Sequence, residues 1–243
     1  MVTRTAYLLI TCEHGGNRIP ARYQSLFADH RAVLASHRGY DAGALNMARA
    51  LAHRFQAPLI HATASRLLVD LNRSIGHRAL YSEATRALPP AERARILARH
   101  YVPYRDAVET LVARAIAAGR RVVHVASHSF TPVLAGCVRT ADIGLLYDPA
   151  RPGERALCAT WGALLAAEIV PFRVRRNYPY QGRNDGLTRR LRHRFPASSY
   201  VGVELEINQK HVVAGSRGSE QRFPLHIRRA VVDSLGRALM IGC

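Results

Sequence analysis

The chain has 243 residues, 48% of them apolar, which predicts one globular domain over residues 1–243 rather than a disordered chain. No apolar run approaches the roughly 20 residues that a membrane-spanning helix requires, so we expect no membrane partner. The only apolar stretch near the N-terminus, residues 6–10, is shorter than the core of a secretory signal peptide. The composition therefore predicts a cytoplasmic protein.

The formal net charge is +18, from 35 basic and 17 acidic residues. Such a balance raises the possibility of a nucleic-acid partner. However, Lys210 is the only lysine, the arginines are scattered along the chain, and the densest basic run, residues 189–194, contains no aromatic residue on which bases could stack. We therefore expect no specific nucleic-acid partner, and instead a basic cleft that attracts an anionic small molecule.

The four cysteines form no CxxC pair, and their spacing suits neither a disulfide framework nor a zinc ribbon. They are Cys12, Cys137, Cys158 and Cys243. Small buried thiols in a reducing compartment are the simplest interpretation, in agreement with a cytoplasmic location.

Short apolar runs alternate with helical patterns along the chain. Predicted strands occupy residues 6–11, 58–61, 67–70, 122–127, 142–147, 172–175 and 200–207. Predicted helices occupy residues 41–55, 89–119 with a break near Pro103, 154–169, and a segment within 219–241. Strands separated by helices predict a three-layer α/β domain with a central sheet.

Two histidines follow or end predicted strands. His14 lies in the glycine-bearing loop EHGGN after the first strand, and His128 lies in SHSF at the end of the strand over residues 122–127. Each could place an imidazole nitrogen on a metal ion. Each could equally be an ordinary hydrogen-bonded histidine, and His124, inside the strand, is interpreted in that way.

Asp41 precedes the first long predicted helix, in the segment RGYD. An aspartate there is most often the N-cap of the helix. It could also be a carboxylate ligand, because two histidines and one carboxylate leave an open position for water at a catalytic zinc ion.

Charged residues flank the predicted strand over residues 67–70. Arg66 and Arg73 could hold a substrate carboxylate in paired hydrogen bonds, or could form ion pairs with Asp70. In the last predicted strand, Glu204 and Glu206 share one face, so one of them is a candidate general base unless the strand is a solvated edge.

A loop rich in Tyr, Pro and Gly covers residues 176–182. Loops of this composition often line or cover a site. We expect Arg176, Asn177 and Tyr180 to contribute to substrate binding.

In chain order, these clusters resemble the N-formylglutamate amidohydrolase family. The matching segments are TCEHGGNRIP, HRGYDAGAL, SRLLVDLNRS, ASHSF, DIGLLYDP, RNYPYQG and VELEINQ. They extend from residue 11 to about residue 210, and SRLLVDLNR and LEINQ are the most specific. The EHGGN form resembles the branch of the family whose substrate is uncertain.

The resemblance implies a mixed sheet flanked by helices, as in zinc carboxypeptidases (a phosphorylase/hydrolase-like fold), with one divalent metal ion, zinc, at the strand ends. His14 matches the first ligand and His128 the later histidine. Carboxypeptidases have HxxE, whereas this chain has Asn17 at the fourth position. We therefore expect Asp41 as the third ligand, with Asn17 or Glu13 as alternatives.

The resemblance also implies the catalytic and substrate-binding residues. Glu206 matches the general base, with Glu204 as the alternative. Arg73, after Asn72, matches an Asn-Arg pair that holds the substrate carboxylate, and Arg66 would stabilise the developing oxyanion.

The activity implied is metal-dependent hydrolysis of the amide bond of an N-acyl amino acid, with N-formylglutamate as the leading candidate. One alternative is another amide or peptide substrate on the same scaffold. Another is a non-catalytic protein that binds an anionic ligand or a nucleic acid. The sequence does not indicate an oligomeric state.

Overall fold

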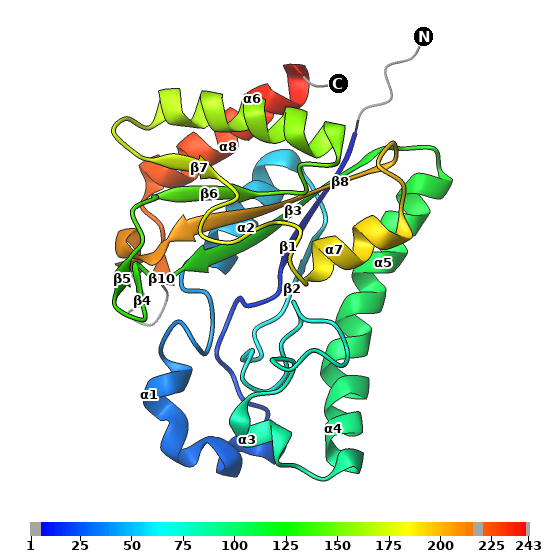
Figure 1. Cartoon of the computed structure of the whole chain (residues 1–243), viewed down its shortest axis with the longest axis vertical. Helices are drawn as coiled ribbons and strands as arrows, with labels where there is room; N and C mark the ends of the chain where they lie inside the picture. Colours follow the sequence, from blue (N-terminus) through cyan, green and yellow to red (C-terminus); the bar gives the residue numbers. More distant parts are fainter. Residues whose placement is uncertain (1–5, 216–220, 242–243) are drawn as a thin grey trace.

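The computed structural model describes residues 6–215 and 221–241, and its centre is one six-stranded sheet (Figure 1). The strand order is β2-β1-β3-β8-β6-β7. The strands are β1 (Tyr7–Cys12), β2 (Leu59–His61), β3 (Val122–Phe130), β6 (Ile143–Leu146), β7 (Val174–Arg176) and β8 (Tyr200–Asn208). The strands β2, β1, β3 and β8 run parallel, and β6 runs antiparallel to β8, so the sheet is mixed.

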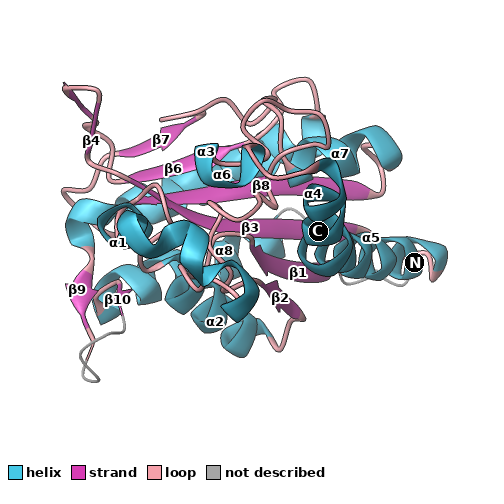
Figure 2. Cartoon of the chain, turned by 90° about the horizontal axis from the view of Figure 1, so that it is seen from below, coloured by secondary structure: helices cyan, strands magenta, loops and turns pink. Residues whose placement is uncertain are grey.

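Helices cover both faces of the sheet, which confirms the predicted three-layer α/β fold (Figure 2). The helices are α1 (Arg31–Leu34), α2 (Ala44–Phe55), α3 (Glu83–Arg86), α4 (Pro90–Ile96), α5 (Val102–Ala117), α6 (Pro152–Glu168), α7 (Leu187–Arg194) and α8 (Leu225–Ile241). None of the described helices is long and apolar enough to cross a membrane. Two small hairpins, β4 (Val133–Leu134) with β5 (Cys137–Val138) and β9 (Val213–Ala214) with β10 (Gln221–Arg222), lie outside the sheet.

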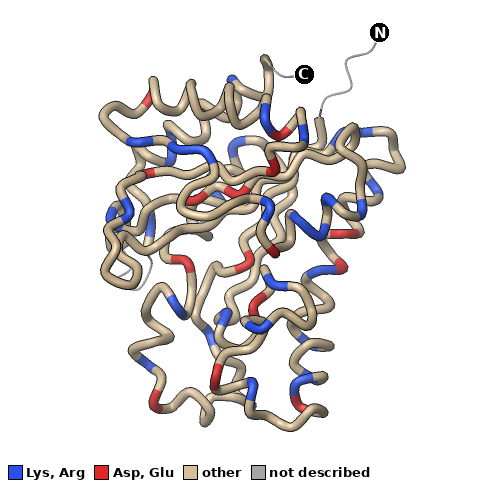
Figure 3. The backbone as a smooth tube through the Cα atoms, in the orientation of Figure 1, with Lys and Arg blue, Asp and Glu red and all other residues tan. Residues whose placement is uncertain are grey.

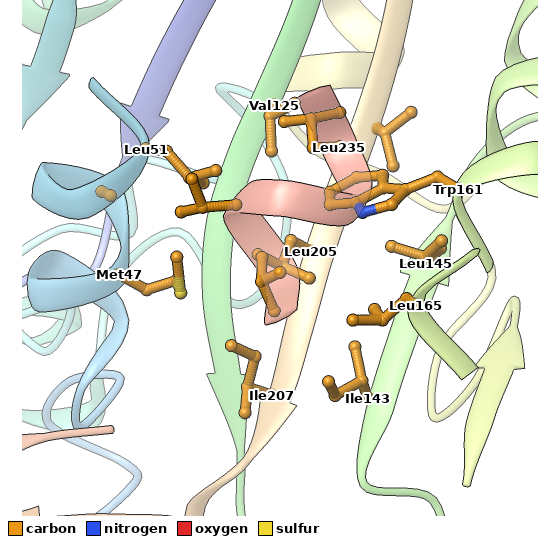
Figure 4. Packing of buried hydrophobic residues seen from close by; sticks show 14 of the residues in the cluster. Met47, Leu51, Val125, Ile143, Leu145, Trp161, Leu165, Leu205, Ile207 and Leu235 are labelled. Atoms are coloured by element: carbon orange, nitrogen blue, oxygen red, sulfur yellow. The ribbon is translucent and has the colours of Figure 1, made fainter. Parts of the chain in front are cut away.

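Each face of the sheet has its own apolar core. On one face, α2, α6 and α8 pack on β3, β6 and β8 through Leu51, Trp161 and Leu235 (Figure 4). On the other face, α5 and α7 pack through residues such as Val108 and Leu191. All nine residues of β3 and all nine of β8 are buried, as expected for central parallel strands covered on both sides.

The direction of the strands places polar residues at one edge. Because β1, β3 and β8 are parallel, their carboxyl ends meet there, and ligands typically bind at that edge of an α/β sheet. His128 lies directly opposite Glu206 in the register of β3 and β8. The loop after β1 brings His14 to the same edge.

The prediction of a strand over residues 67–70 was wrong. This segment is a series of turns, in which Leu68 and Leu71 are buried in the second core while Asp70 bonds to groups outside the segment. The apolar run was that of a packed loop, which periodicity alone does not distinguish from a strand. In place of the predicted break near Pro103, a π-helical turn, Leu97–Tyr101, joins α4 to α5 in a continuous helical run.

The other predicted elements match observed ones to within a few residues at each end. The final helix, Leu225–Ile241, lies within the predicted segment 219–241, and Cys243 lies outside the described residues. Basic residues are spread over the whole chain rather than gathered on one element, as the sequence predicted (Figure 3).

Candidate metal and substrate site

A cavity of about 290 Å³ opens at the carboxyl edge of the sheet. Its lining combines four kinds of predicted residue: the candidate metal ligands, the strand-face glutamates, Asn72 with the arginines of the 66–73 segment, and Tyr180 of the 176–182 loop. Those residues are His14, Asp41, Arg66, Asn72, Arg73, His128, Tyr180, Glu204 and Glu206. Segments that lie far apart in the sequence therefore meet at one concave site.

His14, Asp41 and His128 form a buried cluster that could hold a metal ion. One potential ligand atom from each lies within 4.8 Å of the others, and each residue is at most 4% exposed. Asp41 is not the N-cap of α2, because the helix begins at Ala44 with Gly43, at φ 79°, in the cap position. Its main-chain N–H donates to the carbonyl of His14, which fixes the two loops against each other.

The two histidines present the same nitrogen to Asp41. His14 Nδ1 lies 3.4 Å and His128 Nδ1 2.9 Å from Asp41 Oδ2. The opposite nitrogens face other carboxylates: His14 Nε2 is 2.8 Å from Asp70 Oδ1, and His128 Nε2 is 2.9 Å from Glu13 Oε2. Metal-bound histidines in proteins characteristically have a carboxylate or carbonyl on the outer nitrogen.

This arrangement places the two alternative ligands outside the cluster. The Glu13 carboxylate lies on the far side of the His128 ring from Asp41. Asn17 is exposed, and its amide donates to the carbonyl of Leu34. Of the three candidates for the carboxylate ligand, only Asp41 lies between the histidines.

Opposite charges dominate the electrostatics of the cluster. Burial opposes the charged form of His128, but hydrogen bonds to Asp41 and Glu13 outweigh this effect and raise its pKa well above the ordinary value. Burial would likewise raise the pKa of Asp41, but the charge of His14 and the hydrogen bond to His128 hold that pKa below its ordinary range. The surroundings of the cluster therefore favour an ionised Asp41 beside a positive charge.

The donor set fits a divalent ion such as zinc. Imidazole nitrogens and a carboxylate oxygen are ordinary zinc ligands, and two histidines with one carboxylate is a known catalytic combination. In addition, His14 Nδ1 is buried and has no hydrogen-bond partner among the described residues. A buried acceptor in that condition is costly unless something occupies the space beside it.

Glu204 and Glu206 both line the cavity, as their shared face predicted, but their environments differ. Glu204 Oε1 accepts a hydrogen bond of 2.5 Å from the Thr188 hydroxyl. Glu206 Oε2 is buried with no partner in the described structure, and burial together with the nearby Asp41 and Glu204 raises the pKa of Glu206 to about 8, against the charge of His128. Of the two glutamates, Glu206 is therefore the one with a carboxyl oxygen that no described side chain engages.

The two arginines hold different positions around the cavity. Arg66 Nη2 donates to Asp70 Oδ2 at 2.8 Å, and its Nη1 lies 3.4 Å from Asp41 Oδ1, so this guanidinium borders the metal cluster. Arg73 Nη1 donates to the carbonyl of Asp185 at 2.7 Å, while its Nε is buried without a partner. Both arginines keep donors near the cavity.

Of the remaining substrate-binding candidates, two line the cavity and two do not. Asn72 and Tyr180 line the cavity, although Asn72 Oδ1 also accepts the main-chain N–H of Leu187. Arg176 instead lines a separate depression beside α6. Asn177, at φ 51°, uses its carboxamide to bond the main chain at Tyr147 and Gly182. Neither lines the cavity, which the loop after β7 reaches only from Tyr180 onward.

Several cavity residues had no predicted role. His37 and Arg38 line the cavity; His37 directly precedes the RGYD segment, and Arg38 is its first residue. Asp185 also lines the cavity; its carboxylate accepts from the Ser74 hydroxyl, and its main-chain carbonyl accepts from Arg73. Proximity to a recognised motif was the available signal for His37 and Arg38, but the sequence carried none for the role of Asp185.

The chain is similar to known proteins over most of its length. The sequence model of the family described as N-formylglutamate amidohydrolase matches residues 6–213. The gene product Atu2144 from Agrobacterium tumefaciens, a solved structure, is 33% identical with a TM-score of 0.79, and the match covers 98% of this chain and 92% of that one. An N-formylglutamate amidohydrolase from Ralstonia eutropha JMP134 is 19% identical with a TM-score of 0.68, over 99% and 94% of the two chains. No curated protein matches the sequence.

Proposed function

Since the chain belongs to the N-formylglutamate amidohydrolase family, we propose that it is a metal-dependent hydrolase of N-acyl amino acids, with N-formylglutamate as the leading substrate. The observation that carries this proposal is the buried cluster of His14, Asp41 and His128 at the cavity. Each histidine keeps one nitrogen toward Asp41 and has the other held by a carboxylate. We place the reaction in the cytoplasm.

His14, Asp41 and His128 would hold one divalent ion, and zinc suits these ligands best. When bound, such an ion supplies a Lewis acid that polarises the acyl carbonyl and makes a nearby water more acidic. Asp70 and Arg66 fix the cluster from the other side, because Asp70 bonds both His14 and Arg66.

Glu206 acts as the general base in this proposal. Its Oε2 takes a proton from the attacking water and delivers it to the leaving amine. Two observations support the role: the group lies opposite His128 in the sheet register, and Oε2 is buried without another partner. Glu204, which is occupied by Thr188, is the less suitable group.

The arginines bind and orient the substrate. Arg73 offers a buried, unpaired Nε to the carboxylate of the amino acid, which positions the scissile amide bond. Arg66, beside Asp41, is close enough to the metal cluster to steady negative charge on the acyl oxygen. Asn72 and Tyr180 complete the lining around the amino-acid portion.

The decisive experiment combines metal analysis of the purified protein with a panel of N-acyl amino acids and short peptides. We expect about one equivalent of metal, loss of N-formyl-L-glutamate hydrolysis on chelation, and recovery with zinc or cobalt. Preference for another panel member would identify a different amide substrate. A protein without stoichiometric metal and without hydrolysis would instead be a binding protein for anions.

The substrate carboxylate provides an internal test. Arg73→Gln should lower kcat/KM for the free acid roughly 10–100-fold, because it removes a charged hydrogen-bond donor. The same change should have little effect on a substrate whose α-carboxylate is replaced by a neutral amide. Arg175, which is exposed on the edge strand β7, offers a matched control as Arg175→Gln.

A further inference from the structure

We propose that Glu13 is a positioning residue that, supported by Tyr104, orients His128 so that Nδ1 is the nitrogen presented to the metal ion. This inference rests on the proposed function and assigns a task to a buried carboxylate that is neither a ligand nor a base. Glu13 precedes the ligand His14 in the chain, but it acts on the other histidine.

The position of Glu13 follows from the end of β1. Glu13 and His14 are consecutive, and the Glu13 side chain reaches toward β3 and α5 rather than toward Asp41. Glu13 is 1% exposed, so its carboxylate is removed from water. An ionised carboxylate in such a place is stable only when both oxygens are engaged.

Both oxygens have a neighbour. Oε1 accepts a hydrogen bond of 2.8 Å from the Tyr104 hydroxyl, and Tyr104 lies on α5 with its own position fixed near the carbonyl of Ile60, at 3.3 Å. Oε2 lies 2.9 Å from His128 Nε2. The hydroxyl therefore holds one end of the carboxylate, and the other end is directed at the imidazole.

The His128 ring is consequently held between two carboxylates on opposite sides, Asp41 at Nδ1 and Glu13 at Nε2. A metal ion requires a nitrogen that carries no proton. Glu13 Oε2 lies 2.9 Å from Nε2, within ion-pair distance, and its negative charge favours a proton on that outer nitrogen, which leaves the Nδ1 lone pair toward the cluster. Without Glu13, Nε2 would lose this neighbouring negative charge, and the ring would lose one of its two charged neighbours.

This pairing makes the outer contacts of the two histidines equivalent. His14 is held by Asp70, and His128 is held by Glu13. Glu13, which the sequence left open as an alternative third ligand, thus acts outside the ligand set.

The test measures metal affinity on the folded chain rather than turnover. Zinc and cobalt binding are determined by competition with a chromophoric chelator for the wild type and for Glu13→Gln, Tyr104→Phe and His128→Ala. We expect Glu13→Gln to weaken binding about 10–100-fold, which is the usual effect of losing an outer-shell partner. Tyr104→Phe removes one hydroxyl, and its loss of metal affinity should be several-fold smaller than that of Glu13→Gln.

Glu154→Gln is the matched control. Glu154 is also a fully buried glutamate in an ion pair, with Arg192, but it is not at the cavity. It should lower stability while leaving metal affinity unchanged. The ¹⁵N resonances of His128 in the zinc-loaded protein give a second readout, which general destabilisation does not change: the protonated nitrogen should be Nε2 in the wild type and in Glu154→Gln.

The outcomes separate this inference from the function on which it rests. Unchanged affinity in both Glu13→Gln and Tyr104→Phe, with binding lost in His128→Ala, would overturn the role of Glu13 and leave the metal site intact. A proton on Nδ1 of His128 in the zinc-loaded protein would also overturn it. Should Glu13→Gln fail to fold, Tyr104→Phe and the resonances decide. A wild-type protein that takes up no metal would overturn both proposals.

Discussion

Two histidines four residues apart in β3 have opposite environments. His124, in the middle of the strand, contacts two hydroxyl groups: Thr11 Oγ1 at 2.8 Å from Nε2 and Tyr200 OH at 2.7 Å from Nδ1. His128, at the carboxyl end, contacts the carboxylates of Asp41 and Glu13. Both are buried on the same face of the same strand.

The partners decide the chemistry of each ring. Burial lowers the pKa of His124 to about 4, because its hydroxyl partners do not compensate for lost hydration of the charged form. At His128 the same burial is outweighed by Asp41 and Glu13, and the pKa is raised. Position along a strand therefore separates a structural histidine from a candidate ligand more clearly than residue type does.

Among the substitutions that test this difference between the two histidines, the largest expected effect is on metal binding. His128→Ala should abolish stoichiometric metal binding and lower kcat/KM for N-formyl-L-glutamate on the order of 10³-fold or more, because a ligand is lost. His124→Gln should keep its metal equivalent. Metal analysis and steady-state kinetics on the two variants check this, and similar losses in both would remove the distinction between the rings.

The residues of β8 that lie opposite the two histidines also differ. Gly202 lies opposite His124, whereas Glu206 lies opposite His128. Glu206→Gln should lower kcat roughly 10²–10⁴-fold with metal content unchanged, because the proton acceptor is lost but no ligand is. Glu204→Gln is the paired variant, and a larger loss of kcat there would transfer the role of base to Glu204.

Stability should depend on pH in opposite senses at the two histidines. The folded pKa of His124 lies below the unfolded value of roughly 6.5, so its contribution is present above that pH and is lost as the pH falls toward 4, by roughly 3 kcal/mol in total. In the metal-free protein the raised pKa of His128 has the reverse effect: its contribution is present below pH ~6.5 and is lost as the pH rises through the folded pKa.

Urea unfolding between pH 4.5 and 8 measures this dependence. His124→Gln should reduce the loss of unfolding free energy on acidification relative to the wild type. An identical pH profile for the two proteins would show that the pKa of His124 is the same in the folded and unfolded states, contrary to this prediction.

The smallest expected effect belongs to the hydroxyl that supports His124. Tyr200→Phe should lower the free energy of unfolding by about 1–2 kcal/mol, because one buried hydrogen bond to the ring is lost. Metal content should not change. Denaturant titration beside metal analysis checks both points, and loss of metal would mean that the middle and the end of β3 are coupled.

The sequence was most informative where strand patterns were strong. The β-branched run before His128 predicted a buried strand with His124 inside and His128 at its end, and the structure confirms this arrangement. Alternation along β8 likewise predicted that Glu204 and Glu206 share the cavity. These predictions succeeded because strand periodicity fixes which side chains share a face.

Loops limited the prediction. The apolar residues of the 67–70 segment gave the pattern of a strand, although they pack in turns that bring Asp70 to His14. Arg176 and Asn177 stand in a loop of suitable composition, yet their side chains serve other contacts. His14 and Asp70 are 56 positions apart in the chain, so a single sequence carries no local signal for their contact.

The way Arg73 is anchored has a consequence for how this family could diversify. The proposed metal ligands stand on strand ends and on the adjoining loops, whereas Arg73, the proposed carboxylate-binding residue, donates to the carbonyl of Asp185, in a loop that also supplies Tyr180 to the cavity. In the proposed function, substrate preference and hydrolytic chemistry are thus carried by separate parts of the chain. Exchange of residues 180–185 between relatives is then an evolutionary route to a new amino-acid preference that leaves the metal cluster unchanged.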